Sequence, residues 1–438
     1  LTIELDDLHR PNGRELSWCS SCFPQNRIEN KHLDNMAKWS QIAYDTGALV
    51  DNALEKMGDK SSTRIDGVNA SEEYRDVNAV TVSKTGRKGI YEVNSDTIDG
   101  GFELGVSGGE SRENSSQTMH VSGLRITEES GFPDSFIQVT NTADGELVMT
   151  IAFEGSQEGW EDWIDTNART KMNEDGVHTG FANIAKEYIN GIFNDEYFVN
   201  CTIDGVTKNY RLDQVLSAIS SNDKAHIRIT GHSLGGAAAQ CLTYYLVKED
   251  RVNKHQIETY TFASPIPFGY DAIKDDTYRN MNVYNFINVN DFVPDIGVSK
   301  SNLVVNRLAE ELGAAVGNRI ASSEYNGGYS IAGTNLGTNV YLNSDDLTDW
   351  TKPGFAGDHS MYATYLKLVD GYMDGSLPSY ELDTDIFYSK HYDHSYNDAY
   401  AEFIDISEIA VKALKISRAT VKAGSWAADL LDLADAAK

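Results

Sequence analysis

At Thr230-Gly231-His232-Ser233-Leu234-Gly235-Gly236, a serine stands between glycines where an extended run gives way to a helical one. Residues 225–230 alternate apolar and polar side chains, as a half-buried strand does. Residues 237–247 are rich in alanine and leucine, which favours a helix. A strand, a turn that carries serine and a following helix together predict a nucleophile elbow.

The predicted elbow would give its serine a reactive position. A strand that reverses into a helix within a few residues strains the backbone, and the missing side chains of Gly231 and Gly235 prevent a collision there. The turn presents the Ser233 hydroxyl to a substrate. It also points the backbone N–H of Leu234 to the same place, at the positive end of the helix. His232 would lie on the opposite side of the strand, so we expect a buried structural histidine.

The composition is that of a folded protein with a strongly acidic surface. The chain has 438 residues, 40% of them hydrophobic, and a formal net charge of −29. This charge would repel nucleic acids and anionic lipid surfaces, so a neutral ester or an uncharged lipid is the compatible substrate. No run of about 20 apolar residues occurs, so the sequence predicts a soluble protein without a transmembrane segment. Secreted and cytoplasmic locations both stay open, as does the oligomeric state.

Two short motifs have the spacing of metal ligands. Cys19 and Cys22 are separated as in zinc or redox sites, but no second pair of ligands stands near them in the sequence. His391 and His394 flank a carboxylate in an aromatic, acidic stretch that fits a surface loop better than a zinc site. We therefore expect neither a metal ion nor a cofactor.

The alternation of strand and helix patterns predicts an α/β fold with a mostly parallel central sheet. We expect residues 1–134 to form a helical segment and then a polar, partly stranded insertion. Residues 135–375 should form the α/β core, and residues 376–438 a C-terminal helical extension. Within the core, residues 302–321 carry an amphipathic helical pattern that fits either packing on the core or a cap over the active site, with residues 302–350 as the possible cap.

A serine hydroxyl needs a histidine that accepts its proton and a carboxylate that orients the histidine. In α/β hydrolases the acid and then the histidine follow the serine in the chain. Asp291 directly follows a predicted strand, at the carboxyl edge of the sheet, and Asp295 is the nearby alternative. His359 enters an apolar helical run, whereas His391 and His394 have no such scaffold. We therefore assign Asp291 as the acid and His359 as the base.

The second oxyanion donor should come from a loop after a neighbouring strand. Residues 136–140 and 146–153 flank a glycine-containing turn and should pair as a hairpin. The second of these strands leads into Glu154-Gly155-Ser156. Ser156 is the candidate donor, through its backbone N–H and its hydroxyl, and an ordinary Gly-Ser turn is the alternative.

These motifs together resemble those of the class 3 lipase family, the fungal-type triacylglycerol lipases with their plant and bacterial relatives. The motifs occur in the family's order and are Ala152-Phe153-Glu154-Gly155-Ser156, Asp162-Trp163 with Asp165, Val177-His178-Thr179-Gly180-Phe181, the elbow, Thr261-Phe262-Ala263-Ser264-Pro265, and Asp291 with Val293-Pro294. The resemblance covers about residues 135–370 and implies an α/β-hydrolase fold. It implies that Ser233, Asp291 and His359 form the triad, that Ser156 and Leu234 form the oxyanion hole, and that no metal or cofactor takes part.

The resemblance also locates a lid and a departure from the family. The family's lid follows the oxyanion loop, here residues 157–172, where Trp160, Trp163 and Ile164 would contact either lipid or the protein core. Many relatives carry arginine where this chain has Glu154, so the local charge near the oxyanion loop differs.

The expected function is hydrolysis of carboxylic esters by a lipase that acts on acylglycerols or similar neutral lipid esters, with transient contact to a lipid interface. A phospholipase A1, a feruloyl-type esterase or an acyltransferase would use the same triad. A lipid-binding or scaffold protein on a hydrolase fold that has lost its chemistry is the alternative from another class.

Overall fold

The structure is a computed structural model that describes much of the chain between residues 32 and 383. The described residues are 32–65, 80–95, 121–142, 145–155, 173–194, 197–273, 275, 277–278, 281–288, 290–291, 293–295, 333–347, 355–377 and 379–383. The chain divides into two compact units. The elbow unit comprises Asp34–Gly155 and Ile184–Tyr260, and the C-terminal unit comprises Leu1–Leu33, Ser156–Asn183 and Thr261–Lys438.

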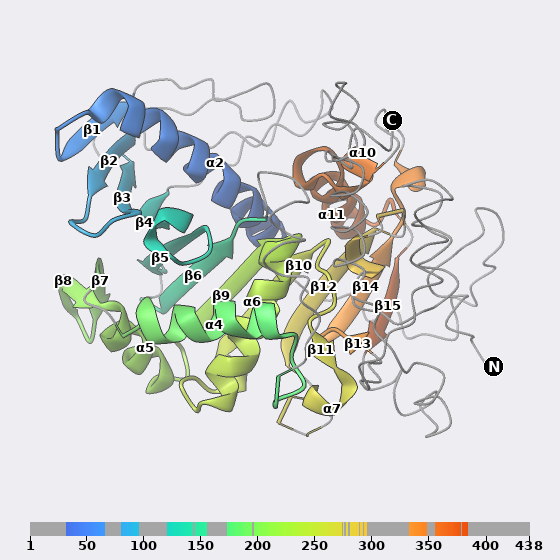
Figure 1. Ribbon diagram of the computed structural model, residues 1–438. Coiled ribbons are helices and arrows are strands. Elements are labelled where there is room, and N and C mark those ends of the chain that lie inside the picture. The colour runs from blue at the N-terminus through green and yellow to red at the C-terminus, as the bar shows by residue number, and fades with distance from the viewer. Residues whose placement is uncertain are drawn as a thin grey trace, which may run out of the picture. The chain divides into compact units, whose positions relative to one another are not determined.

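The elbow unit is built on a mixed β-sheet (Figure 1). Its strands are β1 (Ser62–Ile65), β2 (Val80–Lys84), β3 (Ile90–Ser95), β4 (Ser122–Ile126), β5 (Ser135–Asn141), β6 (Leu147–Phe153), β9 (His226–His232) and β10 (Ile257–Phe262), and neighbours in this list are hydrogen bonded. Strands β1 to β6 pair in antiparallel fashion, whereas β6 and β9 are parallel from Val148↔His226 to Phe153↔Gly231. This parallel register brings the residues after β6 beside the elbow.

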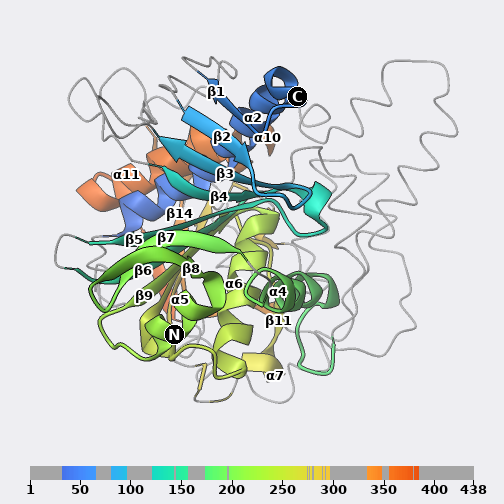
Figure 2. The same ribbon diagram turned by 90° about the vertical axis from the view of Figure 1, so that its left-hand side faces the viewer.

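Helices cover both faces of this sheet. They are α2 (Leu33–Met57), α5 (Leu212–Ser220) and α6 (Leu234–Lys248), and α4 (Thr179–Gly191) enters the elbow unit from the C-terminal unit. Figures 1 and 2 show α2 on one face and α5 and α6 on the other. Every residue of β6 is buried, because a strand covered on both faces has no solvent side. Nearly all of α6 is buried as well, as its apolar composition requires.

A separate hairpin and two short 3-10 turns complete the elbow unit. The hairpin consists of β7 (Phe198–Ile203) and β8 (Val206–Arg211), and the turns are η1 (Glu128–Ser130) and η3 (Lys254–Gln256). Asp204 and Gly205 have φ values of 52° and 77°. Two successive positive φ angles match the twist of a tight hairpin turn, and Asp-Gly is a favoured pair there.

The C-terminal unit contains the strand that precedes Asp291. Its strands are β11 (Phe268–Gly269), β12 (Asn282–Asn288), β13 (Gly333–Thr334), β14 (Thr338–Leu342) and β15 (Tyr380–Asp383). β12 and β14 are parallel, β14 and β15 are antiparallel, and β11 pairs with β13. Its helical segments are α7 (Tyr270–Ile273), η4 (Val293–Asp295), η5 (Ser344–Asp346), α10 (Phe355–His359), the π-helical turn η6 (Met361–Tyr365) and α11 (Leu366–Asp374).

The α/β fold class is confirmed, with parallel strands around the elbow and antiparallel strands at the edges. The hairpin predicted before residue 154 is present as β5 and β6, and the predicted strand and helix around Ser233 are β9 and α6. The helical pattern predicted at residues 302–321 falls outside the described residues. Of the predicted C-terminal helical extension, residues 376–438, the structure describes only residues 376–377 and 379–383, and residues 380–383 form the strand β15. The boundaries at 134 and 375 stay predictions. In the described part of the chain, no helix has both the length and the apolar character needed to cross a bilayer.

Candidate active site

The structure places Ser233 on the turn that the sequence predicts. β9 ends at His232, α6 begins at Leu234, and Ser233 between them has φ 55° and ψ −128°. A positive φ is strained for a residue with a side chain, and it persists only where the surroundings enforce it. Ser233 is largely buried, with 9% of its surface exposed. The backbone therefore has the sharp turn that a serine nucleophile requires.

Two glycines leave room for this turn. A Cβ atom on Gly231 would collide with the carbonyl oxygen of Gly235. A Cβ atom on Gly235 would lie 2.6 Å from the carbonyl oxygens of Phe153 and Glu154. Only glycine avoids both clashes, so the start of α6 can pack directly against the end of β6.

The start of α6 offers backbone donors next to Ser233. The first N–H groups of a helix have no acceptor within that helix, and they lie at its positive end. The Gly236 N–H donates to the Ser233 carbonyl oxygen at 2.9 Å, which closes the first helical turn. Leu234 is the first residue of α6, so its N–H is a suitable oxyanion donor.

The strand that leads to the second predicted donor passes close to Ser233. A Cβ atom built on Gly155 would lie 3.0 Å from Cβ of Ser233 and 2.9 Å from the carbonyl oxygen of His232. The end of β6 therefore meets the elbow immediately before residue 156. Outside the described residues lie the predicted second donor and the predicted lid contacts, Ser156, Trp160, Trp163 and Ile164.

Asp291 and His359, the predicted acid and base, are hydrogen bonded to each other in the C-terminal unit. Nδ1 of His359 donates to Oδ2 of Asp291 at 2.8 Å. Asp291 is 2% exposed, and the His359 side chain is 17% exposed. A buried carboxylate that accepts from Nδ1 fixes the imidazole tautomer in which Nε2 accepts a proton. The structure thus brings these two residues together, while Ser233 belongs to the elbow unit.

Two further donors orient the Asp291 carboxylate. The Tyr365 hydroxyl donates to Oδ2 at 2.8 Å, and the Val293 N–H donates to Oδ1 at 3.0 Å. Burial, together with the negative charge of Asp291, raises the pKa of Tyr365, so the phenol stays a neutral donor. The Tyr365 hydroxyl also accepts from the Asn288 N–H at 3.1 Å. Asp295, the alternative acid, ends η4.

Asn288 connects the segments that carry the acid and the base. Its Nδ2 donates to the carbonyl oxygen of Asp358 at 3.0 Å, and its Oδ1 accepts from the Ser344 N–H at 3.1 Å. The Ser344 hydroxyl donates to Oδ1 of Asp358 at 2.7 Å. The residue before His359 is therefore held on both its backbone and its side chain. The sequence analysis missed these three residues and Tyr365, because nothing in their local pattern marks them.

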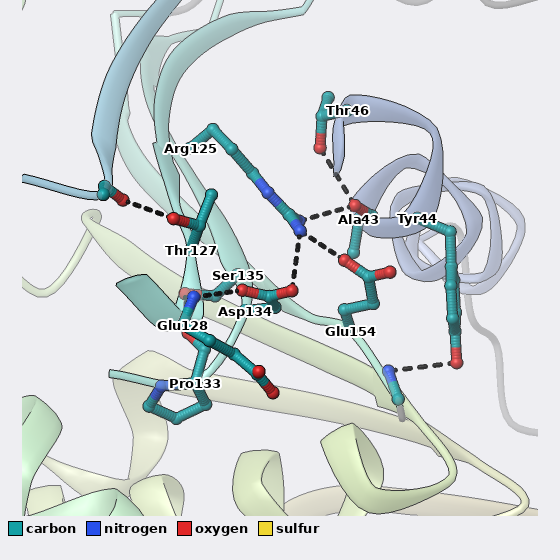
Figure 3. Close-up of polar contacts among 12 residues, drawn as sticks. Ala43, Tyr44, Thr46, Arg125, Thr127, Glu128, Pro133, Asp134, Ser135 and Glu154 are labelled. Atoms are coloured by element: carbon teal, nitrogen blue, oxygen red, sulfur yellow. Dashed lines mark hydrogen bonds and ion pairs between the residues drawn. The ribbon is translucent and has the colours of Figure 1, made fainter. Parts of the chain in front are cut away.

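Glu154 forms a buried ion pair with Arg125 of β4 (Figure 3). The two residues are 3% and 1% exposed, and Arg125 also lies 3.3 Å from Asp134 and donates to the Ala43 carbonyl oxygen at 2.7 Å. Burial lowers the pKa of Arg125, but the charges of Glu154 and Asp134 outweigh burial and raise it, so the guanidinium stays charged. Arg125 is thus the charge partner of the glutamate that departs from the family pattern.

Helix α2 contributes two polar residues near the elbow that the sequence analysis missed. His232 is 5% exposed, which agrees with the predicted buried histidine, and its Nδ1 is hydrogen bonded to the Tyr44 hydroxyl at 2.8 Å. Asp45, which follows Tyr44 in α2, accepts a hydrogen bond from Nε2 of Gln41 at 3.1 Å. Burial, with a smaller contribution from the charge of Glu154, raises the pKa of Asp45 to about 7.

The described residues offer no metal centre. Nowhere in the described part of the chain do three His, Cys, Asp or Glu side chains gather as metal ligands would. Cys201 and Cys241 are buried free thiols, and burial raises the pKa of each. The residues with metal-like spacing in the sequence, Cys19, Cys22, His391 and His394, fall outside the described ranges.

The comparison with protein families agrees with this geometry. Residues 150–300 match the family Lipase (class 3). This part of the chain is therefore similar to the class 3 lipases. The class 3 lipase segment includes the end of β6, the elbow and Asp291, whereas His359 follows it. The match also agrees with the α/β-hydrolase fold that the resemblance implies.

Solved lipase structures are similar to parts of this chain. The triacylglyceride lipase of Rhizomucor miehei is 18% identical, with a TM-score of 0.29, over 39% of this chain and 57% of its own. The M37 lipase is 21% identical, with a TM-score of 0.29, over 41% of this chain and 55% of its own. The lipase of Rhizopus microsporus var. chinensis is 17% identical, with a TM-score of 0.27, over 37% and 52%. The matched region thus spans little more than half the length of these lipases, and no curated protein sequence matches the chain.

Proposed function

We propose that this protein is a serine carboxylic-ester hydrolase that acts on neutral lipid esters. The observation that carries the proposal is the hydrogen bond of 2.8 Å from His359 to the buried Asp291 carboxylate. It leaves Nε2 as the nitrogen that accepts a proton. The strained turn at Ser233 and the class 3 lipase match support the assignment of the nucleophile.

In the proposed reaction, Oγ of Ser233 attacks the ester carbonyl carbon while Nε2 of His359 takes the hydroxyl proton. Asp291 stabilises the resulting imidazolium, and the backbone N–H groups of Leu234 and Ser156 bind the oxyanion. His359 then donates the proton to the leaving alcohol, and an acyl-enzyme remains. Water attacks this ester by the reverse route, with His359 as the base, and the acid is released.

The substrate class follows from the family and the charge. Two of the lipases to which parts of the chain are similar are triacylglycerol lipases by name, and the net charge of −29 disfavours anionic lipid surfaces. Acylglycerols or similar neutral esters therefore fit best. A phospholipase A1, a feruloyl-type esterase and an acyltransferase would share the triad. A panel of acyl chains and head groups, with product analysis in the presence of an alcohol acceptor, separates them.

The variant Ser233→Ala tests the proposal. Turnover of a p-nitrophenyl ester should fall at least ~10³-fold, because the nucleophile is lost, while the circular dichroism spectrum stays unchanged. A fluorophosphonate probe should label the wild-type protein and not the variant. The matched control is Ser217→Ala, an exposed serine in α5 that should retain full activity. A wild-type protein that neither turns over esters nor reacts with the probe would instead be a non-catalytic binding protein.

A further inference from the structure

The Tyr44 hydroxyl joins the end of β6 to the end of β9. It accepts a hydrogen bond from the Gly155 N–H at 3.0 Å, and it is hydrogen bonded to Nδ1 of His232 at 2.8 Å. The two rings meet edge to face, with centroids 5.9 Å apart. One phenol oxygen therefore contacts the last described residue before the predicted oxyanion loop and the residue directly before Ser233. Figure 3 shows the first of these contacts.

The space around Gly155 is closed by the same three groups. A Cβ atom there would collide with the Tyr44 hydroxyl and would lie 2.9 Å from the His232 carbonyl oxygen and 3.0 Å from Cβ of Ser233. The strand end is thus in direct contact with both the elbow and the phenol. A shift of Gly155 would move the surface against which the Ser233 side chain packs.

Helix α2 is itself fixed in place by two other contacts. The Ala43 carbonyl oxygen accepts from Arg125, which pairs with Glu154. The Thr230 hydroxyl on β9 donates to the Met36 carbonyl oxygen at 3.1 Å. Consecutive residues of α2, Ala43 and Tyr44, therefore hold consecutive residues after β6. The helix that carries the phenol is therefore hydrogen bonded to Arg125 of β4 and to Thr230 of β9.

We propose that Tyr44 is a positioning residue of the ester hydrolase, and this inference rests on the function proposed above. Its hydroxyl keeps the end of β6 against the elbow, which holds Oγ of Ser233 and the N–H of Leu234 in the alignment that attack and oxyanion binding need. Tyr44 acts through Gly155 and His232 and does not touch the substrate. Nothing in the local sequence of α2 distinguishes it from a tyrosine used only for packing.

The variant Tyr44→Phe removes this hydroxyl and keeps the ring. We expect kcat for a p-nitrophenyl ester to fall ~10-fold with KM nearly unchanged, because misplacement of reacting groups affects the transition state more than substrate binding. The rate of labelling by a fluorophosphonate should fall by a similar factor. The matched control is Tyr210→Phe, which removes a hydroxyl bonded to the Ile203 and Val206 carbonyl oxygens in the β7–β8 hairpin. This control should keep both rates.

A double-mutant cycle with Gly155→Ala tests the route by which Tyr44 acts. If both substitutions disturb the same contact, the fold-loss of kcat in the double variant should be smaller than the product of the two single fold-losses. The reason is that the methyl group added at position 155 no longer meets the Tyr44 hydroxyl. Losses that multiply independently would overturn the inference, as would a Tyr44→Phe protein that keeps the wild-type kcat and labelling rate. An inactive, unlabelled wild-type protein would instead refute the proposed function. If Tyr44→Phe does not fold, a Gly155→Ala protein that keeps the wild-type kcat would overturn the inference, because its methyl group must displace the Tyr44 hydroxyl.

Discussion

The elbow and the Asp291–His359 pair are held by different kinds of interaction. At the elbow, backbone atoms pack so closely that Gly231 and Gly235 leave no room for a side chain, and all seven residues of the motif are contiguous. At the acid and base, side-chain hydrogen bonds join distant parts of the chain, since Asp291 bonds to His359 and Tyr365, which are 68 and 74 residues away from it. Steric constraint fixes the first region, and a hydrogen-bond network fixes the second. Substitutions of the elbow glycines should therefore affect stability most, whereas substitutions in the Asp291–His359 pair should affect activity most.

The largest effect should come from Asp291→Asn, which keeps the shape of the acid but reverses the hydrogen bond to the imidazole. We expect kcat to fall roughly 10⁴-fold, because the wrong tautomer of His359 is favoured. Steady-state kinetics with a soluble ester measure this loss. Asp295→Asn is the control and should retain activity, since the imidazole bonds to Asp291. Equal losses in both variants would contradict the assignment of the acid.

The variant Gly231→Ala should destabilise the elbow unit without altering any of the proposed catalytic groups. The added methyl group collides with the Gly235 carbonyl oxygen, so we expect a loss of about 3 kcal/mol in unfolding free energy. Gly58→Ala is the control, because a Cβ atom there would have no atom within 4 Å. Its φ of 55° is unfavourable for alanine, so this variant should cost about 1 to 2 kcal/mol. Urea denaturation of the two variants gives the comparison. A control that is destabilised as much as Gly231→Ala would show that steric closeness does not fix the elbow.

The buried Asp45 should make the stability of the elbow unit depend on pH. Its pKa is raised to about 7 by burial, so the folded state binds the proton more tightly than the unfolded state. The contribution of Asp45 to the free energy of unfolding has its full value below the ordinary pKa of 3.8, and it declines as the pH rises from there to about 7. The variant Asp45→Asn should therefore gain over wild type by ~1.4 kcal/mol per pH unit between pH 5 and 7, with no further gain above. Denaturation curves at several pH values measure the gap, and a gap independent of pH would contradict the burial effect.

The smallest effect should come from Tyr365→Phe, which removes one of the donors to Asp291. Oδ2 still accepts from His359 and Oδ1 still accepts from the Val293 N–H, so we expect kcat to fall only about 3-fold to 10-fold, equivalent to roughly 1 kcal/mol. Tyr372→Phe, a change in the same helical region where the ring packs on Phe286, should leave kcat as it is. A 10³-fold loss for Tyr365→Phe would show that the phenol takes part in catalysis.

The same contrast explains what the sequence could predict. The elbow can be predicted from the sequence because its strand, glycines and helix are neighbours in the chain. Asp291 and His359 are predicted from chain order and from the few histidines that follow the serine, and the structure shows that these two residues are hydrogen bonded to each other. Tyr44, Arg125 and Asn288 were not found, because each acquires its role from partners brought near by the fold, and a tyrosine, arginine or asparagine in a strand or helix carries no mark of such a partner.

The position of Arg125 limits how this chain can be shortened. The segment that matches the class 3 lipase family begins at residue 150, yet the cation that neutralises Glu154 comes from β4 and the carbonyl oxygen that anchors this cation comes from α2. A fragment trimmed to the family match would carry an uncompensated carboxylate in an apolar interior, a change that costs several kcal/mol. Grafting this catalytic segment onto another scaffold would therefore require residues 34–57 and β4 to be transferred with it.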